Sequence, residues 1–348
     1  MALARNLYAP ADGRVASRFV SLGPPRNGSE QAWWWALPLV KHAVGYQAAL
    51  TAEMRRLLDA WQPQVIHLNH LTYCMTCALL EANRPRGIPT IAICHGTDLL
   101  DARADPGHRA DAIRTLSQAT VTLFPTSAMA SEAAALSPRT AERFRVVPWG
   151  IPRVPVAPAR DPEGADALYA GRLDQNKDVA TIVAALSDPG FGGGLTVVGT
   201  GPERERLERL AARLGVLDRV TFTPFVERAR LWDMFGRFWS LIVSSRELEG
   251  FGLVAVEAQA AGLPVIYSAT AGISEVLGDS ALAFEPGSPA SLAAAVSRLR
   301  SDPSLRAALR EAGLTNSARF DMRRFRDSVE GLAAELTSPS SPAAAGRR

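Results

Sequence analysis

The 348-residue sequence is poor in lysine and cysteine and lacks long apolar runs. Only two of its 38 basic residues are lysines, Lys41 and Lys177, so each lysine is worth examining. Three cysteines, an odd number, exclude a disulfide scaffold. No apolar run approaches the roughly 20 residues of a membrane span, and residues 1–14 contain no signal-peptide-like apolar segment. We therefore expect a cytoplasmic protein with at most peripheral contact at the inner membrane face.

The charge is almost balanced, with a formal net value of +3, which is too mild to indicate a nucleic-acid binder. Hydrophobic residues make up 47% and charged residues 21%, as in a soluble globular chain. The length is too great for one ordinary core and about right for two domains.

Short apolar runs alternate with longer helical patterns along the chain. The expected strands cover residues 64–69, 90–94, 120–125, 145–148, 167–171, 195–199, 220–224, 241–244, 264–268 and 281–284. Expected helices include residues 51–60, 73–82, 179–186, 203–214, 253–261, 291–299 and 305–311. This alternation, with nearly continuous apolar strands, predicts an α/β protein whose parallel sheets are covered on both faces.

Five prolines between residues 148 and 162 interrupt this pattern and predict an extended linker at 151–164. We expect an N-terminal domain over 1–150 and a second domain over 165–320. A helix at 321–336 is expected to return to the first domain, followed by a disordered tail at 337–348. Each domain has enough strands for a doubly wound sheet, and two such domains facing each other would form a ligand cleft.

The strongest chemical signal follows the expected strand at 241–244. Gly250 and Gly252 let the backbone approach a ligand closely, and a helix starting near Leu253 points its positive end at the same place, which predicts an anion site. Glu257 lies about one turn inside this helix among apolar neighbours, where hydroxyls of a sugar or ribose would satisfy it. Glu249 would lie at the mouth of the pocket. The alternative is a solvated Glu249 and a Glu257 that merely pairs with an arginine.

A second signal follows the strand at 167–171, where Arg172 and Lys177 flank a loop. Two cations facing a helix N-terminus would grip a diphosphate, although both could be ordinary surface residues. Gly199 and Gly201 form a lone glycine pair at the end of the next strand, for which a tight turn is at least as good an explanation as ligand contact.

In the first domain, His95 and Gly96 end a strand, and this histidine is either a ligand contact or structural. The spacing of His67, His70, Cys74 and Cys77 could hold zinc, but burial explains these residues better. The cluster at 33–35 is either an aromatic platform for a ring or lipid or part of the core.

Taken together, these motifs resemble the nucleotide-sugar-dependent glycosyltransferases of family 4, which have the GT-B fold of two Rossmann-like domains facing a central cleft. The glutamate pair of that family matches Glu249 and Glu257, and its glycine-arginine-leucine loop with a following lysine matches 171–177. Residues 95–98, 147–150, 199–202 and 261–265 also fit, so the resemblance covers about residues 60 to 335.

The resemblance implies site residues in both domains. Arg172 and Lys177 would hold the donor diphosphate, Glu257 the ribose and Glu249 the sugar. Phe225 and Val226 would lie near the base, and His95 would face the sugar. The implied catalytic residues are His95, Arg172, Lys177 and Glu249. The implied donor site comprises Gly171, Arg172, Lys177, Gly199, Phe225, Val226, Glu249, Gly250, Phe251, Gly252, Leu253, Val254 and Glu257. On the acceptor side we expect Gly96, Asp98, Trp33 and Trp34.

The implied activity is a retaining transfer of sugar from a UDP- or GDP-linked donor to a small-molecule, lipid or glycan acceptor, with no cofactor and no metal in the site. Two alternatives stay open. One is a non-catalytic or truncated nucleotide-sugar-binding partner subunit. The other is a GT-B epimerase or phosphorylase, although the loop position of Lys177 argues against a pyridoxal phosphate linkage.

Three features depart from the family pattern. Asp178 follows the lysine where glycine is usual, and Pro224 replaces a usual glycine. The opening strand and glycine-rich loop have no clear counterpart, because the strand expected at 15–22 reads as the second of the family and residues 23–28 substitute poorly for the loop. This predicts either a trimmed variant of reduced or altered activity or a misassigned start.

Overall fold

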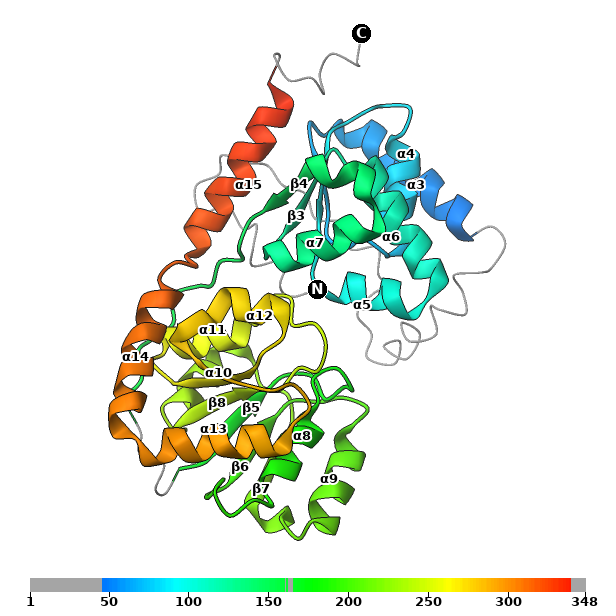
Figure 1. The fold of residues 1–348 in the computed structure, drawn as a ribbon. Helices are drawn as coiled ribbons and strands as arrows, with labels where there is room; N and C mark the ends of the chain where they lie inside the picture. The colour runs from blue at the N-terminus through cyan, green and yellow to red at the C-terminus, as the bar shows by residue number, and fades with distance from the viewer. Residues whose placement is uncertain (1–45, 160, 162–164, 339–348) are drawn as a thin grey trace. The chain divides into compact units, whose positions relative to one another are not determined.

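The computed structural model describes residues 46–159, 161 and 165–338 (Figure 1). These residues divide into two compact units. The N-terminal unit includes residues 46–124, 130–146 and 326–338, and the C-terminal unit includes 125–129 and 147–325 among the described residues. The strand expected at 15–22, the loop at 23–28 and the predicted acceptor-side residues Trp33 and Trp34 lie outside the described residues.

Among its described residues, the N-terminal unit contains a four-stranded parallel sheet in the order β1-β2-β3-β4. Its strands are β1 (Ile66–Leu68), β2 (Thr90–Ile93), β3 (Val121–Phe124) and β4 (Phe144–Val146). The accompanying helices are α3 (Tyr46–Trp61), α4 (Cys74–Asn83), α5 (Thr97–Ala104), α6 (Pro106–Gln118) and α7 (Ser127–Leu136). Every residue of β2 and β3 is buried, as expected for the inner strands of a parallel sheet.

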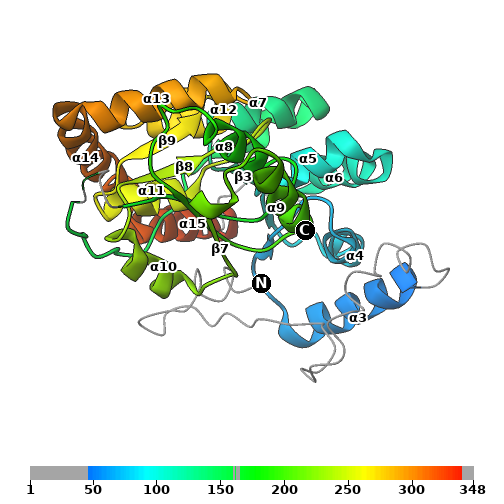
Figure 2. The same cartoon turned by 90° about the horizontal axis from the view of Figure 1, so that it is seen from below.

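The C-terminal unit contains a six-stranded parallel sheet in the order β10-β9-β8-β5-β6-β7. Figure 1 labels β5, β6, β7 and β8 of this sheet, and Figure 2 labels β8 and β9. Its strands are β5 (Ala167–Ala170), β6 (Leu195–Val198), β7 (Val220–Thr223), β8 (Ser240–Val243), β9 (Val265–Ser268) and β10 (Leu282–Phe284). The chain runs outward from β5 to β7, returns to β8 beside β5, and then runs to the other edge. The direction therefore reverses between β5 and β8, and ligands of doubly wound sheets bind at such a switch point.

Among the described residues, seven helices lie between or after these strands, and an eighth continues into the N-terminal unit. They are α8 (Val179–Ala185), α9 (Arg204–Arg213), α10 (Arg228–Phe235), α11 (Leu253–Ala260), α12 (Ala271–Leu277), α13 (Pro289–Ser301), α14 (Pro303–Ser317) and α15 (Met322–Thr337). Short 3-10 turns complete the described elements: η2 (Pro138–Arg143), η3 (Leu217–Arg219) and η4 (Gly278–Ser280).

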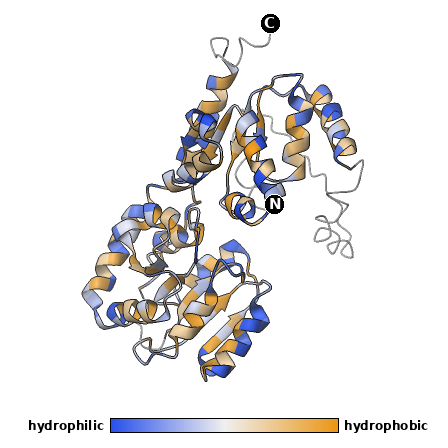
Figure 3. Cartoon of the chain, turned by 45° about the vertical axis from the view of Figure 1, so that its right-hand side comes forward, coloured by the Kyte–Doolittle hydropathy of each residue, from blue (hydrophilic) through white to orange (hydrophobic). Residues whose placement is uncertain are grey.

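The core of the C-terminal unit lies on both faces of its sheet. Alternate residues of β5 enter opposite clusters: Ala167 and Tyr169 join one, and Leu168 and Ala170 join the other. This alternation follows from the two-residue period of a strand. The strands are accordingly among the most hydrophobic segments, while helices at the surface carry polar faces (Figure 3). The predicted α/β class with parallel sheets covered on both faces is confirmed.

The ten strands expected between residues 64 and 284 are all present, with bounds within two residues of those predicted. The named helices are present as well, but α5, α6, α7, α10 and α12 were not among them. Helix α7 illustrates why, because its sequence is almost entirely small or apolar and offers no contrast between a buried and an exposed face.

Candidate functional site

The two strongest motifs of the sequence lie in neighbouring loops of the C-terminal unit. One loop, 171–178, follows β5, and the other, 244–252, follows β8. These strands pair in parallel, so both loops leave the carboxyl edge of the sheet at the switch point.

Lys177 and Glu249 form an ion pair between these loops. The ammonium Nζ lies 2.5 Å from Oε2 of Glu249, and the same oxygen accepts a 2.6 Å hydrogen bond from the hydroxyl of Ser245. The Lys177 side chain is 23% exposed and that of Glu249 is 13% exposed, so the pair is largely withdrawn from water yet still reachable. The structure therefore brings together two predicted catalytic residues, and Glu249 is not a solvated loop residue.

The surroundings keep Glu249 ionised. Burial by itself would raise the pKa of this carboxyl group. The charge of Lys177, the hydrogen bonds from Lys177 and Ser245, and the charge of Arg172 together outweigh burial and lower the pKa below its usual value. A second cation of the motif thus acts on the same carboxylate.

Arg172 occupies the outer side of this site. Its side chain is 64% exposed and lies 3.1 Å from a carboxylate oxygen of Asp174. The backbone beside it is anchored, because the Tyr169 hydroxyl donates a 2.7 Å hydrogen bond to the carbonyl of Arg172. Burial raises the pKa of Tyr169 well above its usual value, so this hydroxyl keeps its proton. An exposed guanidinium on a fixed backbone can meet an anion from solution.

Asn176 ties the two loops to each other, which the sequence did not reveal. Its side-chain amide donates to the carbonyl of Leu248 at 3.0 Å and accepts from the backbone amide of Glu247 at 3.2 Å. The backbone amide of Arg246 donates to the Asn176 carbonyl at 2.7 Å. The relative position of Lys177 and Glu249 is therefore set by several bonds besides their own.

Asp178 explains the departure from the usual glycine. Its backbone has φ 44° and ψ 46°, in the left-handed region that favours glycine and that aspartate tolerates better than most residues. The buried carboxylate accepts from the Thr181 hydroxyl at 2.7 Å and from Nε of Arg246 at 3.2 Å. These bonds offset the backbone strain and add a further link between the loops.

Gly199 and Gly201 let a third loop press against the first. A β-carbon on Gly199 would lie 1.9 Å from the Gly171 carbonyl oxygen, and one on Gly201 would lie 2.3 Å from that of Leu173. Gly199 also has φ 147°. The glycine pair is thus explained by the close approach of two backbones.

The segment 250–252 leads into helix α11 as predicted. Gly252 is the N-cap with φ 74°, and a β-carbon there would lie 2.8 Å from a methyl carbon of Ile273. The Phe251 ring is buried and packs edge-on against Phe320 at 5.2 Å. Only the backbone of Phe251 is therefore available to a ligand. Leu253 and Val254, the first residues of α11, are partly buried against the same core.

Glu257 is engaged by two side chains that sequence reasoning missed. One carboxylate oxygen accepts from Nη2 of Arg228, and the other accepts from the Trp232 indole nitrogen at 2.9 Å. Pairing with an arginine was the alternative considered from the sequence. A contact between helices leaves no sequence motif, so the residue spacing did not identify Arg228 or Trp232 as the partners.

The two residues predicted to lie near the base come just before Arg228. The Phe225 side chain is 66% exposed and Val226 is partly buried.

The N-terminal unit has its own polar cluster where β1 and β2 end. Asp98 is completely buried and accepts from the amides of Leu71 and His95, both at 2.6 Å. The His70 ring lies 2.7 Å from the same carboxylate through Nδ1. Asp98 therefore presents no surface to a ligand and acts by holding its neighbours.

His95 keeps exposed surface next to this cluster, and Gly96 takes φ 90° at the start of α5. Partial burial lowers the pKa of His95, the Asp98 carboxylate opposes this effect, and His70 adds to it. The net lowering favours a neutral imidazole at pH 7.

Two residues of the possible zinc pattern have surroundings that explain them without a metal. His70 pairs with Asp98, and burial together with Asp111 raises the pKa of Cys77 to about 12. Across the described part of the chain, no group of three or more histidine, cysteine, aspartate or glutamate residues is arranged to hold a metal ion.

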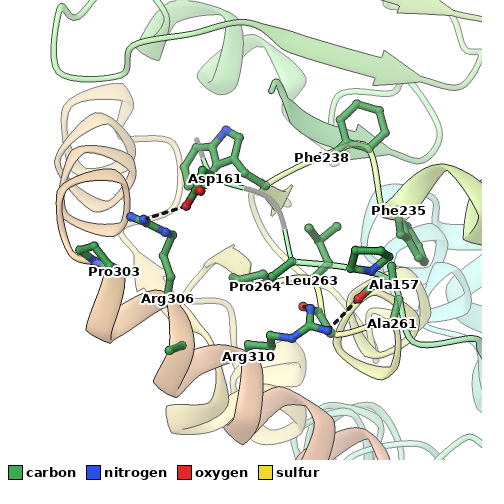
Figure 4. Close-up of a pocket in the computed structure, with 15 residues that line it drawn as sticks. Ala157, Asp161, Phe235, Phe238, Ala261, Leu263, Pro264, Pro303, Arg306 and Arg310 are labelled. Atoms are coloured by element: carbon green, nitrogen blue, oxygen red, sulfur yellow. Dashed lines mark hydrogen bonds and ion pairs between the residues drawn. The ribbon is translucent and has the colours of Figure 1, made fainter. Parts of the chain in front are cut away.

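A cavity of about 200 Å³ lies at the amino ends of the strands of the C-terminal sheet, where β8 and β9 begin (Figure 4). The candidate site lies at their carboxyl ends. Two arginines line this cavity, and both interact with other groups of the protein. Arg306 donates hydrogen bonds to the carbonyls of Leu299 and Arg300 and forms an ion pair with Asp161. Arg310 donates to the carbonyls of Gly262 and Ala157. None of the predicted site residues lines this cavity.

Among the helices that the structure describes, none has the length and apolar character needed to cross a membrane.

Two family models match the chain. Glycosyltransferase Family 4 matches residues 10–153, and Glycosyl transferases group 1 matches residues 153–315. The D-inositol 3-phosphate glycosyltransferase of Acidothermus cellulolyticus is 35% identical over 216 residues, which cover 55% of this chain and 47% of that protein. D-inositol 3-phosphate glycosyltransferase 1 of Catenulispora acidiphila is 28% identical over 91% of this chain and 82% of its own length. The chain thus spans about half of the first relative.

Solved structures show the same fold. Sucrose-phosphate synthase from Thermosynechococcus elongatus superposes with a TM-score of 0.73 at 25% identity, over 83% of this chain and 78% of that one. HepE from Anabaena, solved with UDP and glucose, gives 0.74 at 20% identity, over 84% and 83% of the two chains. These similarities confirm the predicted GT-B fold with two Rossmann-like domains.

Proposed function

The chain belongs to glycosyltransferase family 4, and from this membership we propose that it transfers a sugar from a nucleoside-diphosphate donor to an acceptor hydroxyl with retention of anomeric configuration. The observation that carries the proposal is the Lys177–Glu249 pair at the switch point of the C-terminal sheet, with Arg172 on the same loop. In such an arrangement, Lys177 and Arg172 offer positive charge to a diphosphate. The ionised Glu249 beside them can accept hydrogen bonds from sugar hydroxyl groups.

In this proposal the protein itself neutralises the departing diphosphate. Breaking the bond between the anomeric carbon and the phosphate oxygen leaves negative charge on the diphosphate and an oxocarbenium-like sugar. Arg172, Lys177 and the backbone amides at the start of α11 supply positive charge at that point. The acceptor oxygen then bonds to the anomeric carbon from the leaving-group side, and its proton passes to the departing phosphate oxygen.

Hydroxyl groups of the donor would be held by the two glutamates. Glu249 and the backbone of 250–252 would hold the sugar, and Glu257 would hold the ribose. Phe225 and Val226 would lie beside the base, where the exposed Phe225 ring offers a stacking surface. Gly171, Gly199, Leu253 and Val254 complete the proposed donor site as backbone contacts.

The N-terminal unit would supply His95 as the group facing the sugar and Gly96 on the acceptor side. Asp98 would contribute by holding His95 and His70, since its carboxylate is fully buried. The acceptor is proposed as a small molecule, lipid or glycan. The names of the curated relatives make phosphorylated polyols such as inositol phosphate the first class to test.

The direct test is release of nucleoside diphosphate from UDP- and GDP-linked sugars, first without an acceptor and then with a panel of acceptors. UDP-glucose comes first, because HepE was solved with UDP and glucose. Turnover with a product of retained configuration, identified by nuclear magnetic resonance, supports the proposal. Tight donor binding without turnover on any acceptor would favour a non-catalytic subunit instead.

Metal removal provides a separate prediction. Because two side-chain cations and a helix start are proposed to balance the diphosphate, we expect turnover in excess EDTA to stay within about twofold of the untreated value. The measurement is initial rate before and after chelation, with magnesium added back as the control. If chelation lowers turnover and added magnesium restores it, the two side-chain cations and the helix start do not balance the diphosphate charge on their own.

The lowered pKa of His95 predicts where activity fails in acid. The ring is neutral above its pKa, which lies below the usual value of 6.5, so kcat/KM should stay level from pH 8 to 6.5 and fall only at lower pH. A protonated ring facing the oxocarbenium-like sugar would oppose its positive charge, so we expect His95→Gln to lower kcat by about 10²-fold and to abolish this acid limb. The pH profiles of both proteins check the result, and an unchanged limb in the variant would assign the ionisation to another group.

A further inference from the structure

Glu257 is held by two residues of helix α10 that belong to no recognised motif. We call Glu257, Arg228 and Trp232 the Glu257 clamp. Nη2 of Arg228 contacts Oε1, and the indole nitrogen of Trp232 lies 2.9 Å from Oε2. Each carboxylate oxygen thus receives one hydrogen bond from a different side chain, which fixes the plane of the carboxylate.

Burial explains why the clamp is needed. The Glu257 side chain is 4% exposed, and an ionised carboxylate so far from water is costly unless charge and hydrogen bonds compensate it. Arg228 supplies the charge, and its own side chain is 31% exposed. Each carboxylate oxygen has about two lone-pair sites, so two hydrogen bonds leave room for two more. The carboxylate is oriented without being saturated.

The helix geometry links the two clamping residues. Arg228 and Trp232 are four residues apart on α10 and so lie on one face of the helix. The guanidinium carbon lies 5.5 Å from the centre of the Trp232 ring, within cation–π range. Helix α10 follows the segment with Phe225 and Val226, so one short stretch of chain joins the proposed base contact to the clamp.

We propose that Arg228 and Trp232 are positioning residues that aim the Glu257 carboxylate at the vicinal diol of the donor ribose. The inference rests on the proposed function, since it concerns the same nucleotide site. A fixed carboxylate accepts from both ribose hydroxyls at once, so the clamp makes the site prefer ribose over 2′-deoxyribose. Without the clamp, Glu257 is free to rotate and that preference disappears.

The experiment compares UDP with 2′-deoxy-UDP by isothermal titration calorimetry on the full chain, or GDP with 2′-deoxy-GDP where the wild type prefers guanine. We expect the wild type to bind the ribonucleotide at least about tenfold more tightly, as for loss of one hydrogen bond to a charged group. In Trp232→Phe and Arg228→Met the ratio should fall to about twofold or less. Arg230→Met, at an exposed position of the same helix, is the matched control and should keep the wild-type ratio.

Pyrophosphate binding separates positioning from a general loss of structure. We expect both clamp variants to bind pyrophosphate as the wild type does, and Arg228→Lys to give an intermediate ratio because it restores charge without the fork geometry. The conservative Trp232→Phe variant keeps an aromatic ring packed against the core, so it tests the proposal even where Arg228→Met folds poorly. A full wild-type ratio in Trp232→Phe overturns the proposed clamp role while leaving the proposed function intact. A wild type that binds neither UDP nor GDP overturns both.

Discussion

Lys177→Met should lower the turnover number for sugar transfer by about 10²–10³-fold, the cost of removing one group that stabilises charge in a transition state. The substitution removes the ammonium proposed to neutralise the departing diphosphate. It also leaves the Glu249 carboxylate, 13% exposed, without its closest cation. Methionine keeps most of the length and apolar character of the lysine stem, so the change is chiefly one of charge. The measurement is the rate of nucleoside diphosphate release at saturating donor.

A double variant distinguishes chemistry from folding. Lys177→Met alone should lower the melting temperature, because breaking an ion pair leaves an uncompensated, mostly buried charge. Lys177→Met combined with Glu249→Gln removes both charges and should regain most of that stability while staying inactive. Arg209→Met is the control, since it removes an exposed arginine whose partner, Glu205, is also exposed. A single variant with turnover within threefold of wild type would refute the proposed role of Lys177.

The sequence indicated which loops carry the candidate site residues, but it did not indicate the ion pair between Lys177 and Glu249. Glycines at strand ends, a helix start and a rare lysine indicated an anion site by local rules that need no tertiary structure. Periodicity located β5 and β8 within a residue, but it could not show that they are neighbours. Strand order depends on which helices cover which face, and that choice is made by packing across the whole unit.

The contacts that sequence reasoning missed come from segments without a motif. Ser245 follows the strand expected at 241–244, and Arg228 is one of 36 arginines, so neither drew attention in the sequence. Both gain their role only when a distant carboxylate comes within hydrogen-bonding distance. Phe251 is the reverse case. Its position in the glycine-rich motif predicted a donor contact, but its ring is buried in the core and only its backbone can serve as that contact.

Gly199→Ala should lower the free energy of unfolding by about 3 kcal/mol or more, from backbone strain and overpacking together. The new β-carbon would lie 1.9 Å from the Gly171 carbonyl oxygen, so the loop bearing Arg172 must move to accommodate it. The backbone at φ 147° is also one that alanine rarely adopts. Because the displaced loop holds a proposed diphosphate contact, the affinity for UDP or GDP should weaken by about tenfold, the equivalent of losing one modest hydrogen bond.

Control substitutions at two other glycines separate backbone strain from overpacking as causes of the lower stability. Gly215 has φ 68°, and a β-carbon added there would meet no atom within 4 Å, so Gly215→Ala measures the strain alone, about 1–2 kcal/mol. Gly331 lies in α15 with equally open surroundings, and Gly331→Ala should stabilise the helix by roughly 0.5–1 kcal/mol. Chemical denaturation gives the three energies, and calorimetry gives the nucleotide affinity. If Gly199→Ala lowers the free energy of unfolding by no more than Gly215→Ala does, the close approach of the backbones at Gly199 and Gly171 is not required for stability. The glycine pair would then be explained by its turn conformation, and the loop with Arg172 would be held by the Tyr169 hydroxyl and its other bonds.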